Sequence, residues 1–481
     1  MSLKLYNTLT RKVETFEPLG GNKVRIYVCG VTIYDRCHLG HARALVIFDL
    51  LYRFLKDKGY EVDFVRNFTD IDDKILSRAQ EEKVSWKEVV QRNLHAFQED
   101  FKDFGLLTPM VEPRATEHIA DMIHLIELLM QKGVAYASDG EVFFSVKKFP
   151  AYGKLSGQTL EELRSGTRVE VNPKKKDPED FVLWKASREG EPSWPSPWGP
   201  GRPGWHIECS AMSLKYLGSP FDIHGGGTDL IFPHHENEIA QSEGATGKLF
   251  SQFWIHNGMV TLQSEKMSKS TGNLTRVQEI LKKYPAEVAR FFLLTAHYRS
   301  PLEFSWELLE QAEKAVSRGY TALKSLREGL EEDQLPDKIQ DLLPLQNIWQ
   351  RFEGALDNDL NTPVAIAVFF EAVKAIHQAF ANSKRISHSS HQPIFEEAQK
   401  GFRKIASILG AFEKDPNDYF QKSRLTQTSL TDSEIHAQIR LREEARSRKD
   451  WKQADIIRQK LYDEGIVLED TPKGTIWKIN F

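Results

Sequence analysis

KVRIYVCGVTIYDRCHLGHARALVIFDLLYRFL, residues 23–55, is the stretch that decides the fold. Residues 23–29 form a short apolar run of the kind that becomes a buried strand. From His38 onward, apolar residues recur at spacings of three and four, which predicts a helix. Residues 61–67 (EVDFVRN) predict a second strand, and another helix is expected from Ile71. This alternation predicts an α/β, Rossmann-like domain whose parallel sheet has a ligand crevice at the carboxyl ends of its strands.

The alternation of strands and helices breaks from about 101 to 204, which we interpret as an insertion between two halves of the sheet domain. Within it a hairpin is expected at 134–146. The Pro- and Gly-rich segment 192–205 (PSWPSPWGPGRPGW) is expected to be a loop. Strands of the sheet are expected to return near 221–224 and 253–256, and the sequence after them is almost wholly helical.

The bulk composition fits a core-forming protein of about three domains, with 481 residues, 40% hydrophobic and 27% charged. No apolar run approaches the ~18 residues that span a bilayer, and no signal peptide is evident. We therefore expect a cytoplasmic protein without membrane association. Three cysteines cannot form a disulfide framework and point to metal or catalysis. The net charge of −4 argues against a generally basic nucleic-acid binder but leaves local basic patches open.

Two short motifs, HLGH (38–41) and KMSKS (266–270), have features of a triphosphate-binding site. A helix start offers unpaired N–H groups and a positive dipole to phosphate, and Gly40 leaves room for a nucleotide ring. The lysines of the second motif lie in a Ser-rich loop from which they can reach a triphosphate. Each motif alone has an ordinary explanation, as helix histidines or as a solvated loop. Their occurrence together in this order is far less expected by chance.

HLGH and KMSKS resemble the two signatures of class I aminoacyl-tRNA synthetases, in which both motifs stabilise the triphosphate while a carboxylate attacks the α-phosphorus. The resemblance implies catalytic roles for His38, His41, Lys266 and Lys269. It also implies that these residues and Gly40 bind ATP, which is used with Mg²⁺. Positioning and charge stabilisation dominate the catalysis of such transfers. An ionised carboxylate needs no general base, and none is expected.

Four side chains have the chemistry of zinc ligands: Cys29, Cys209, His234 and Glu238. The last two stand at i and i+4 of an expected helix, which places them on one face. Their neighbours His235 and Glu236 are competing ligands, and the pattern does not choose among the members of HHENE (234–238). Either cysteine alone is as well explained as a small buried hydrophobic residue.

The stretches GWHIECS (204–210) and HGGGTDLIFPHHENE (224–238) are similar to those of cysteinyl-tRNA synthetases. The resemblance covers essentially the whole chain, from LYNT (5–8) through TDIDDK (69–74) to the C-terminal tail, and no motif position departs from it. It implies that Cys29, Cys209, His234 and Glu238 hold one zinc ion per chain, and that the substrate cysteine binds the metal through its thiolate.

Selection by a metal would distinguish cysteine from serine, which a pocket that judges only shape separates by ~1–3 kcal/mol. An alcohol stays protonated and is a poor zinc ligand. Four protein ligands would nevertheless fill a tetrahedral site, whereas a catalytic zinc keeps one position open. Either Glu238 binds weakly, or the site expands when substrate binds.

By the same resemblance the amino-acid pocket is lined by Thr69, Trp205, His224 and Asp229. Asp229 is a natural partner for the α-ammonium group of the substrate, and a helix or turn cap is its alternative role. Cys37 has no partner in this scheme and is expected to be structural.

The tail between Arg440 and Lys460 carries eight Lys or Arg against four Asp or Glu, with one Trp among them. That mixture suits single-stranded RNA, whose bases stack on aromatic rings while its phosphates meet cations. A solvated amphipathic helix is the alternative. The tail resembles the anticodon-recognition domain of the cysteinyl enzymes. The resemblance implies that the tRNA contacts are Arg446, Trp451, Asp455, Arg458 and Asp470.

We therefore expect a monomeric ligase that converts L-cysteine and ATP to cysteinyl-adenylate and transfers cysteine to the 3′ end of tRNA(Cys). The expected domains are a Rossmann-like catalytic domain (1–265) with its insertion, a KMSKS and stem-contact region (266–310), a helical bundle (311–420) and an anticodon-binding domain (433–481). One alternative is a cysteine-activating ligase with an amine acceptor, of the kind used in mycothiol synthesis; the tail argues against it. The other is a non-catalytic, zinc-bearing RNA-binding protein, which would have no use for two triphosphate motifs.

Overall fold

The computed structural model describes residues 2–158, 172–262, 265–266, 275–338, 343–420, 432–464, 466–471 and 474–479. The chain divides into two compact units. The first unit consists of Met1–Arg276, Leu293–Glu303 and Glu353–Ala365. The second unit consists of Val277–Phe292, Phe304–Phe352 and Ile366–Phe481.

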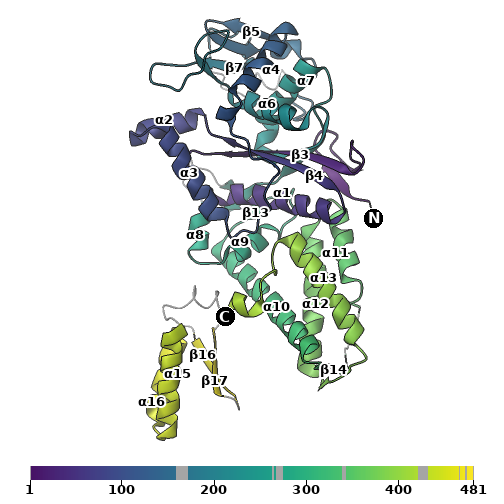
Figure 1. Cartoon of the computed structure of the whole chain (residues 1–481), viewed down its shortest axis with the longest axis vertical. Coiled ribbons are helices and arrows are strands. Elements are labelled where there is room, and N and C mark those ends of the chain that lie inside the picture. Colours follow the sequence, from purple (N-terminus) through teal and green to yellow (C-terminus); the bar gives the residue numbers. More distant parts are fainter. Residues whose placement is uncertain are drawn as a thin grey trace. The chain divides into compact units, whose positions relative to one another are not determined.

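A four-stranded parallel sheet forms the centre of the first unit (Figure 1), in the order β10-β9-β3-β4. The strands are β3 (Lys23–Thr32), β4 (Glu61–Thr69), β9 (Phe221–Gly227) and β10 (Ser251–Asn257). In register, Val28 of β3 lies opposite Gly225 of β9, and Thr32 lies opposite Thr69 of β4. The carboxyl ends of the strands therefore meet at one edge, and the predicted parallel-sheet fold is confirmed.

The first two helices of this unit begin where side chains cap them. Helix α1 (Leu39–Asp57) starts directly after His38, as the apolar spacing predicted, and its long apolar face is buried. Helix α2 (Asp73–Glu82) starts two residues after the expected position, because the side chain of Asp72 accepts a hydrogen bond from the N–H of Lys74 and fixes the first turn there. Helix α3 (Trp86–Phe101) follows.

Between β4 and β9 the chain forms an antiparallel sheet in the order β5-β6-β7-β8. Its strands are β5 (Ala135–Ser138), β6 (Glu141–Phe144), β7 (Phe181–Ala186) and β8 (Gly201–Pro203), with helix α4 (Ile119–Gln131) beside them. The predicted hairpin is confirmed by the pairing of β5 with β6. The prediction of a loop throughout 192–205 was wrong at its end. There Arg202 pairs with Lys185 in an edge strand, which tolerates proline, and Trp205 begins helix α6.

The antiparallel sheet shares one hydrophobic core with the central sheet. Tyr27 and Val65 of the central strands belong to the same buried cluster as Met122 of α4 and Phe144 of β6. Helices α6 (Trp205–Leu217) and α7 (Glu236–Thr246) pack against each other, and both contribute to that cluster. The remaining strands of this unit are β1 (Lys4–Asn7), β2 (Lys12–Thr15), β11 (Val260–Leu262), β12 (Glu265–Lys266) and β13 (Leu302–Glu303).

The second unit is mainly helical, as the periodicity predicted. It contains α8 (Val277–Leu281), α10 (Trp306–Glu331), α13 (Gln392–Leu409), most of α9 (Ala286–Leu293) and α12 (Thr362–Asn382), and the first half of α11 (Ile348–Asp357). A two-residue pairing of β14 (Leu335–Pro336) with β15 (Arg385–Ile386) interrupts the helices. Phe369 of α12 packs edge-on against Phe402 of α13, which places it in the core of the bundle.

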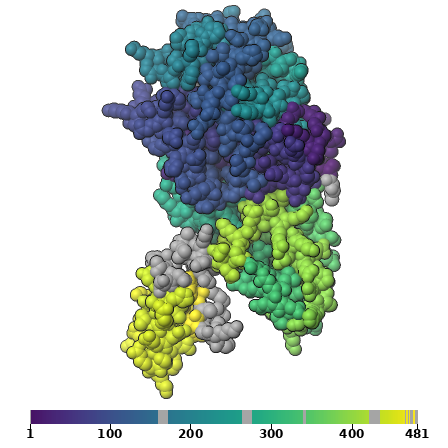
Figure 2. Space-filling model, viewed as in Figure 1, coloured from purple at the N-terminus to yellow at the C-terminus, as the bar shows by residue number. Residues whose placement is uncertain are grey.

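The C-terminal part has a small core of its own. It consists of α15 (Asp432–Ser447), α16 (Trp451–Asp463) and the hairpin β16 (Ile466–Thr471) with β17 (Gly474–Ile479). The buried residues include Ile439, Leu461 and Trp477. The side chains of α15 and α16 form most of the yellow surface in Figure 2.

Among the described residues, helix α12 alone is long and apolar enough to cross a membrane by length and composition. It is interrupted by Glu371, Lys374 and His377, so it is no continuous apolar run. Burial of 44% of its most apolar window, together with the packing of Phe369, fits the core helix of a bundle.

Candidate active site

A cavity of about 600 Å³ lies at the carboxyl ends of β3, β9 and β10 of the first unit. It is the edge at which the parallel order predicted a ligand crevice. Its wall combines residues from the end of β3, the first turns of α1 and the segments that follow β9 and β10. The residues of interest in this wall are Cys29, Tyr34, His38, Gly40, His41, Lys74, Trp205 and Asp229.

The two histidines of HLGH cap helix α1 and also line the cavity. His38 is the N-cap, and its Nδ1 accepts a hydrogen bond from the N–H of Gly40 at 3.1 Å. His41 returns the contact, since its Nδ1 accepts from the N–H of His38 at 3.3 Å. The two rings stack with centroids 3.7 Å apart. A Cβ on Gly40 would lie 2.9 Å from the ring of His38, so this glycine leaves room for the histidine as well as for a ligand.

The KMSKS motif falls mostly outside the described residues. Lys266 ends strand β12, where it pairs with Thr261 of β11; its side chain lies outside the description. Lys269 lies wholly outside the described residues. Residues 258–260, which precede β12, line the cavity. The chain therefore approaches the motif from the cavity wall.

The four predicted metal ligands converge beside the cavity: Cys209, His234 and Glu238 are buried, and Cys29 is half-buried in the cavity wall. One donor atom from each of Cys29, Cys209, His234 and Glu238 lies within 4.8 Å of the others. The Cys29 Sγ lies 3.2 Å from Oε1 of Glu238, and the Nε2 of His234 lies 3.1 Å from the same oxygen. Two thiols, an imidazole and a carboxylate are a donor set that fits zinc.

The helix expected to carry the last two ligands is divided at its start. His234 belongs to a short π-helical turn, Ile231–His235, which directly precedes α7 with Glu238. Phe232 within that turn has extended backbone angles. The i, i+4 relation survives because the turn and α7 are continuous from Pro233 onward, and it brings the two side chains together.

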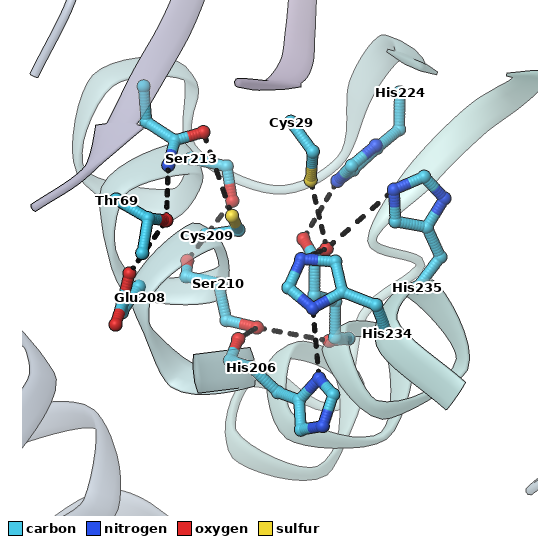
Figure 3. A network of polar contacts seen from close by, with 12 residues as sticks. Cys29, Thr69, His206, Glu208, Cys209, Ser210, Ser213, His224, His234 and His235 are labelled. Atoms are coloured by element: carbon cyan, nitrogen blue, oxygen red, sulfur yellow. Dashed lines mark hydrogen bonds and ion pairs between the residues drawn. The ribbon is translucent and has the colours of Figure 1, made fainter. Parts of the chain in front are cut away.

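A second donor set overlaps the first, and it includes one of the competing ligands. Cys29, His224, His235 and Glu238 also lie within 4.8 Å of one another. Figure 3 shows Cys29, His224, His234 and His235 turned toward the same point. The other competitor, Glu236, turns elsewhere: its carboxylate accepts hydrogen bonds from the N–H groups of Leu155 and Ser156. The structure therefore brings His235 to the cluster and holds Glu236 away from it.

Electrostatics within the cluster favour the thiolate at Cys209 but not at Cys29, where burial, together with Cys209 and Glu238, raises the pKa well above its usual range. Burial opposes ionisation of the Cys209 thiol, but its hydrogen bond with Cys29 and its contact with His234 outweigh burial and lower its pKa to about 6. Burial likewise disfavours a charged His234 ring, but Glu238 and Cys209 raise its pKa to about 10. The pKa of Glu238 is held well below its usual range because His224 and His234 overcome the cost of burial. A thiolate is the form of cysteine that binds metal.

The four residues expected in the amino-acid pocket divide into two pairs. Trp205 and Asp229 line the cavity, and the Trp205 ring stacks on that of His234 at 4.1 Å. Thr69 and His224 are buried and do not line the cavity. His224 contacts Glu238 at 2.8 Å, and the hydroxyl of Thr69 donates to Glu208 at 3.0 Å. Cys37 is buried, and burial raises the pKa of its thiol.

Sequence reasoning missed several residues that surround the cluster. His206 contacts His234 at 2.9 Å between their Nδ1 atoms, and the Nε2 of His256 contacts Nδ1 of His235 at 2.8 Å. Asn67 and Glu208 are also buried beside it. Two of these residues, His206 and Glu208, stand inside the GWHIECS motif, in which only Trp205 and Cys209 had been assigned roles.

The residues expected to contact tRNA lie at the surface of the C-terminal part, and the structure describes all of them. Trp451 begins α16 and is 58% exposed, and Asp455 and Arg458 follow on the same exposed face at i+4 and i+7. Asp470 is paired with Arg446 at 2.7 Å and with Arg442 at 2.8 Å. The tryptophan that packs this small core is Trp477, not Trp451.

Three family descriptions match the chain in succession. Residues 15–314 match the class I (C) catalytic domain of tRNA synthetases, and residues 351–413 match the DALR domain. Residues 429–477 match the cysteinyl-tRNA ligase anticodon binding domain. The exposed face of α16 lies within this last match.

Similar proteins carry the name cysteine--tRNA ligase. One from Thermodesulfovibrio yellowstonii is 50% identical and covers 99% of each chain, and one from Geobacter metallireducens is 48% identical over 100% of each chain. Among solved structures, a methionyl-tRNA synthetase from Mycobacterium tuberculosis has a TM-score of 0.61 at 16% identity, covering 80% of this chain and 90% of that one. This last likeness shows the shared fold.

Proposed function

The chain belongs to the cysteine--tRNA ligase family of class I aminoacyl-tRNA synthetases, and we propose that it activates L-cysteine with ATP as cysteinyl-adenylate. Charging of tRNA with cysteine follows from the family. The adenylate, the zinc ion and the roles of individual residues are the proposal. The observation that carries it is the buried cluster of two cysteines, a histidine and a carboxylate beside a cavity of about 600 Å³.

We assign one zinc ion to Cys29, Cys209, His234 and Glu238. This set holds two sulfur ligands where the overlapping set holds one, and soft thiolates suit zinc. Bound zinc supplies a soft Lewis acid that takes a substrate thiolate in preference to an alcohol. Because Cys29 lies both in the cluster and in the cavity wall, a substrate in the cavity can reach the metal position with its thiol.

The cavity wall suggests how the amino acid is held. Asp229, on the cavity surface, accepts the α-ammonium group, and the Trp205 ring covers the thiol end next to His234. Thr69 and His224 complete the pocket from behind this wall, where His224 holds the carboxylate of Glu238 in place. We propose that these four residues together define the cysteine site.

For the nucleotide, we assign His38, Gly40 and His41 to ATP. The histidines lie in the cavity at the start of α1, where the helix dipole favours phosphate. Lys266, at the end of β12, and Lys269 are proposed to reach the triphosphate, together with Mg²⁺. These groups lower the barrier by stabilising charge and by positioning the cysteine carboxylate for attack on the α-phosphorus, with pyrophosphate as the leaving group.

A pyrophosphate-exchange assay with each of the twenty amino acids tests the activation step. We expect exchange with cysteine and only background with serine, its closest match in shape. A zinc chelator should abolish exchange, and added Zn²⁺ should restore it. Full exchange in a preparation shown to be metal-free would refute the role of zinc, and equal exchange with serine would refute selection through sulfur.

The acceptor is tested separately. We expect charging of tRNA(Cys) and no transfer of cysteine to a small amine acceptor, because residues 429–477 match an anticodon binding domain. Transfer to an amine with no tRNA charging would favour the ligase of the mycothiol type. We further propose that the active protein is a monomer, which sedimentation at assay concentrations would check.

A further inference from the structure

The side chain of Asn67 contacts both segments that carry the cysteine ligands. Asn67 lies on β4 with an exposed fraction of 1%. Its Oδ1 accepts a hydrogen bond from the N–H of Gly30, the residue after Cys29, at 2.9 Å. The thiol of Cys209 contacts the same oxygen at 3.7 Å. One amide thus joins the end of β3 to helix α6.

The backbone of β3 is shaped to make this contact. The register between β3 and β4 shifts between Val28 and Val31, as in a β-bulge. A Cβ on Gly30 would lie 1.6 Å from the backbone oxygen of Asn67, so only glycine allows the two strands to approach this closely. The bulge therefore directs the N–H of Gly30 at the Asn67 side chain and sets the position of Cys29 beside it.

A second set of hydrogen bonds fixes the orientation of the amide. The Nδ2 of Asn67 donates to the Thr69 hydroxyl at 3.4 Å, and that hydroxyl donates to Oε2 of Glu208 at 3.0 Å. Glu208 is fully buried and precedes Cys209 on α6. Figure 3 shows Thr69, Glu208 and Cys209 together on one side of the cluster. Hydrogen bonds therefore run from Gly30 through Asn67 and Thr69 to Glu208. They hold both the Asn67 oxygen that Cys209 contacts and the residue that precedes Cys209 in α6.

We propose that Asn67 is a positioning residue that holds Cys29 and Cys209 at the spacing required for metal binding, with Thr69 and Glu208 holding its amide in place. This inference rests on the proposed zinc site. Ligands that come from distant parts of the chain must be held in place before the ion arrives, or binding must also order them. Partners of the ligands commonly change metal affinity ~10–100-fold when they are replaced.

The test is the zinc affinity of the folded full-length chain, measured by competition with a chromophoric chelator. We expect Asn67→Ala to bind zinc ~10–100-fold more weakly and to release it faster than wild type. Asn67→Asp should also bind more weakly. Its carboxylate can still accept from Gly30, but it cannot donate to Thr69 and adds negative charge next to two thiolates. Thr69→Val, which leaves the contacts of Asn67 with Gly30 and Cys209 in place, should cause a smaller loss.

A matched control is Asn93→Ala. Asn93 is also buried and hydrogen-bonded, to the carbonyl oxygen of Val89 in helix α3, and it is outside both donor sets. This variant should keep wild-type zinc affinity. Because Co²⁺ absorbs strongly when thiolates bind it, the cobalt spectrum of Asn67→Asp should show altered thiolate bands, whereas that of Asn93→Ala should match wild type.

Wild-type zinc affinity in Asn67→Ala and Asn67→Asp would overturn the proposal, even if their melting temperatures fell. An equal loss of affinity in the Asn67 and Asn93 variants would also overturn it, since general destabilisation would then explain both. If Asn67→Ala does not fold, the isosteric Asn67→Asp decides the matter. Wild-type protein that binds no zinc would refute the proposed metal site itself, a result separate from these.

Discussion

Replacement of the exposed Trp451 by alanine should separate tRNA charging from amino-acid activation. Trp451 opens α16 with 58% of its surface exposed, and it shares its face with Asp455 and Arg458. Trp451 lies within residues 429–477, which match an anticodon binding domain, whereas HLGH and the donor cluster lie in the first unit. A ring in this position has an open face on which a base can stack.

The expected loss of tRNA charging follows from base stacking, and the expected loss of stability follows from the exposure of the ring. Base–aromatic stacking contributes ~1–3 kcal/mol per base, and ~1.4 kcal/mol corresponds to a tenfold change. Trp451→Ala should therefore weaken tRNA charging roughly 10- to 100-fold, seen mainly as a higher KM for tRNA. Truncation of a buried Trp costs ~3–5 kcal/mol. Because more than half of its surface is exposed, truncation of Trp451 to alanine should cost less than about 2 kcal/mol of stability.

The assay compares two activities of the same preparation. Cysteine-dependent pyrophosphate exchange, which uses no tRNA, should remain near wild type. Charging of tRNA(Cys) should fall, and Trp451→Phe should recover most of it because it keeps an aromatic face. Ile456→Ala is the matched control: Ile456 is 52% exposed on the same helix, but five residues further on it points about 140° away. It should charge tRNA normally.

Two results would refute this reasoning. Equal losses in exchange and charging would mean that the tail supports the fold of the catalytic unit. Unchanged tRNA charging combined with a large drop in melting temperature would mean that Trp451 serves packing. The second result would require a buried role that its exposure contradicts.

Three further predictions concern the metal, the signature loop and acid stability. Metal analysis of the purified protein should find about one zinc per chain. Cys209→Ser should lose most of this zinc, whereas Cys37→Ser, at a buried cysteine outside both donor sets, should keep it. Lys269→Ala should slow adenylate formation by ~10²-fold or more in exchange assays while cysteine binding without ATP stays unchanged; lost binding with normal exchange would contradict this. A hydrogen bond from Arg442 holds the pKa of Asp470 below its usual range. The pair thus stabilises the tail above the unfolded pKa of ~3.9 and loses that effect as pH falls below it. Asp470→Asn should therefore flatten the pH dependence of unfolding between roughly pH 5 and 2, and an unchanged slope would argue against the pair.

Local patterns were sufficient for most elements. The apolar run of 23–29 and the spacing after His38 predicted β3 and α1 because strand alternation and helical spacing involve near neighbours in the chain. Patterning failed at 201–203. There proline and glycine indicated a loop, but an edge position in a sheet allowed a strand. The start of α2 depended on which side chain caps it, a choice that periodicity does not register.

The candidate site shows the same division. Residue types and motif spacing named Cys29, Cys209, His234 and Glu238, because sulfur, imidazole and carboxylate have metal-binding chemistry wherever they stand. Spacing could not decide among the members of HHENE, in which His235 and Glu236 compete with His234 and Glu238. Rotation along the turn before α7 brings His235 to the cluster and directs Glu236 to the backbone of Leu155 and Ser156.

The sequence by itself therefore determined the fold class, the family and the chemistry of the candidate metal ligands, since these depend on residue type and short-range periodicity. Only the tertiary structure decided which side chains share a cavity wall and which stand behind it, as Thr69 and His224 do. It also placed Asn67 between two cysteine-bearing segments far apart in the chain. Such contacts depend on strand order, register and packing across the core, and no local pattern specifies distances of that kind.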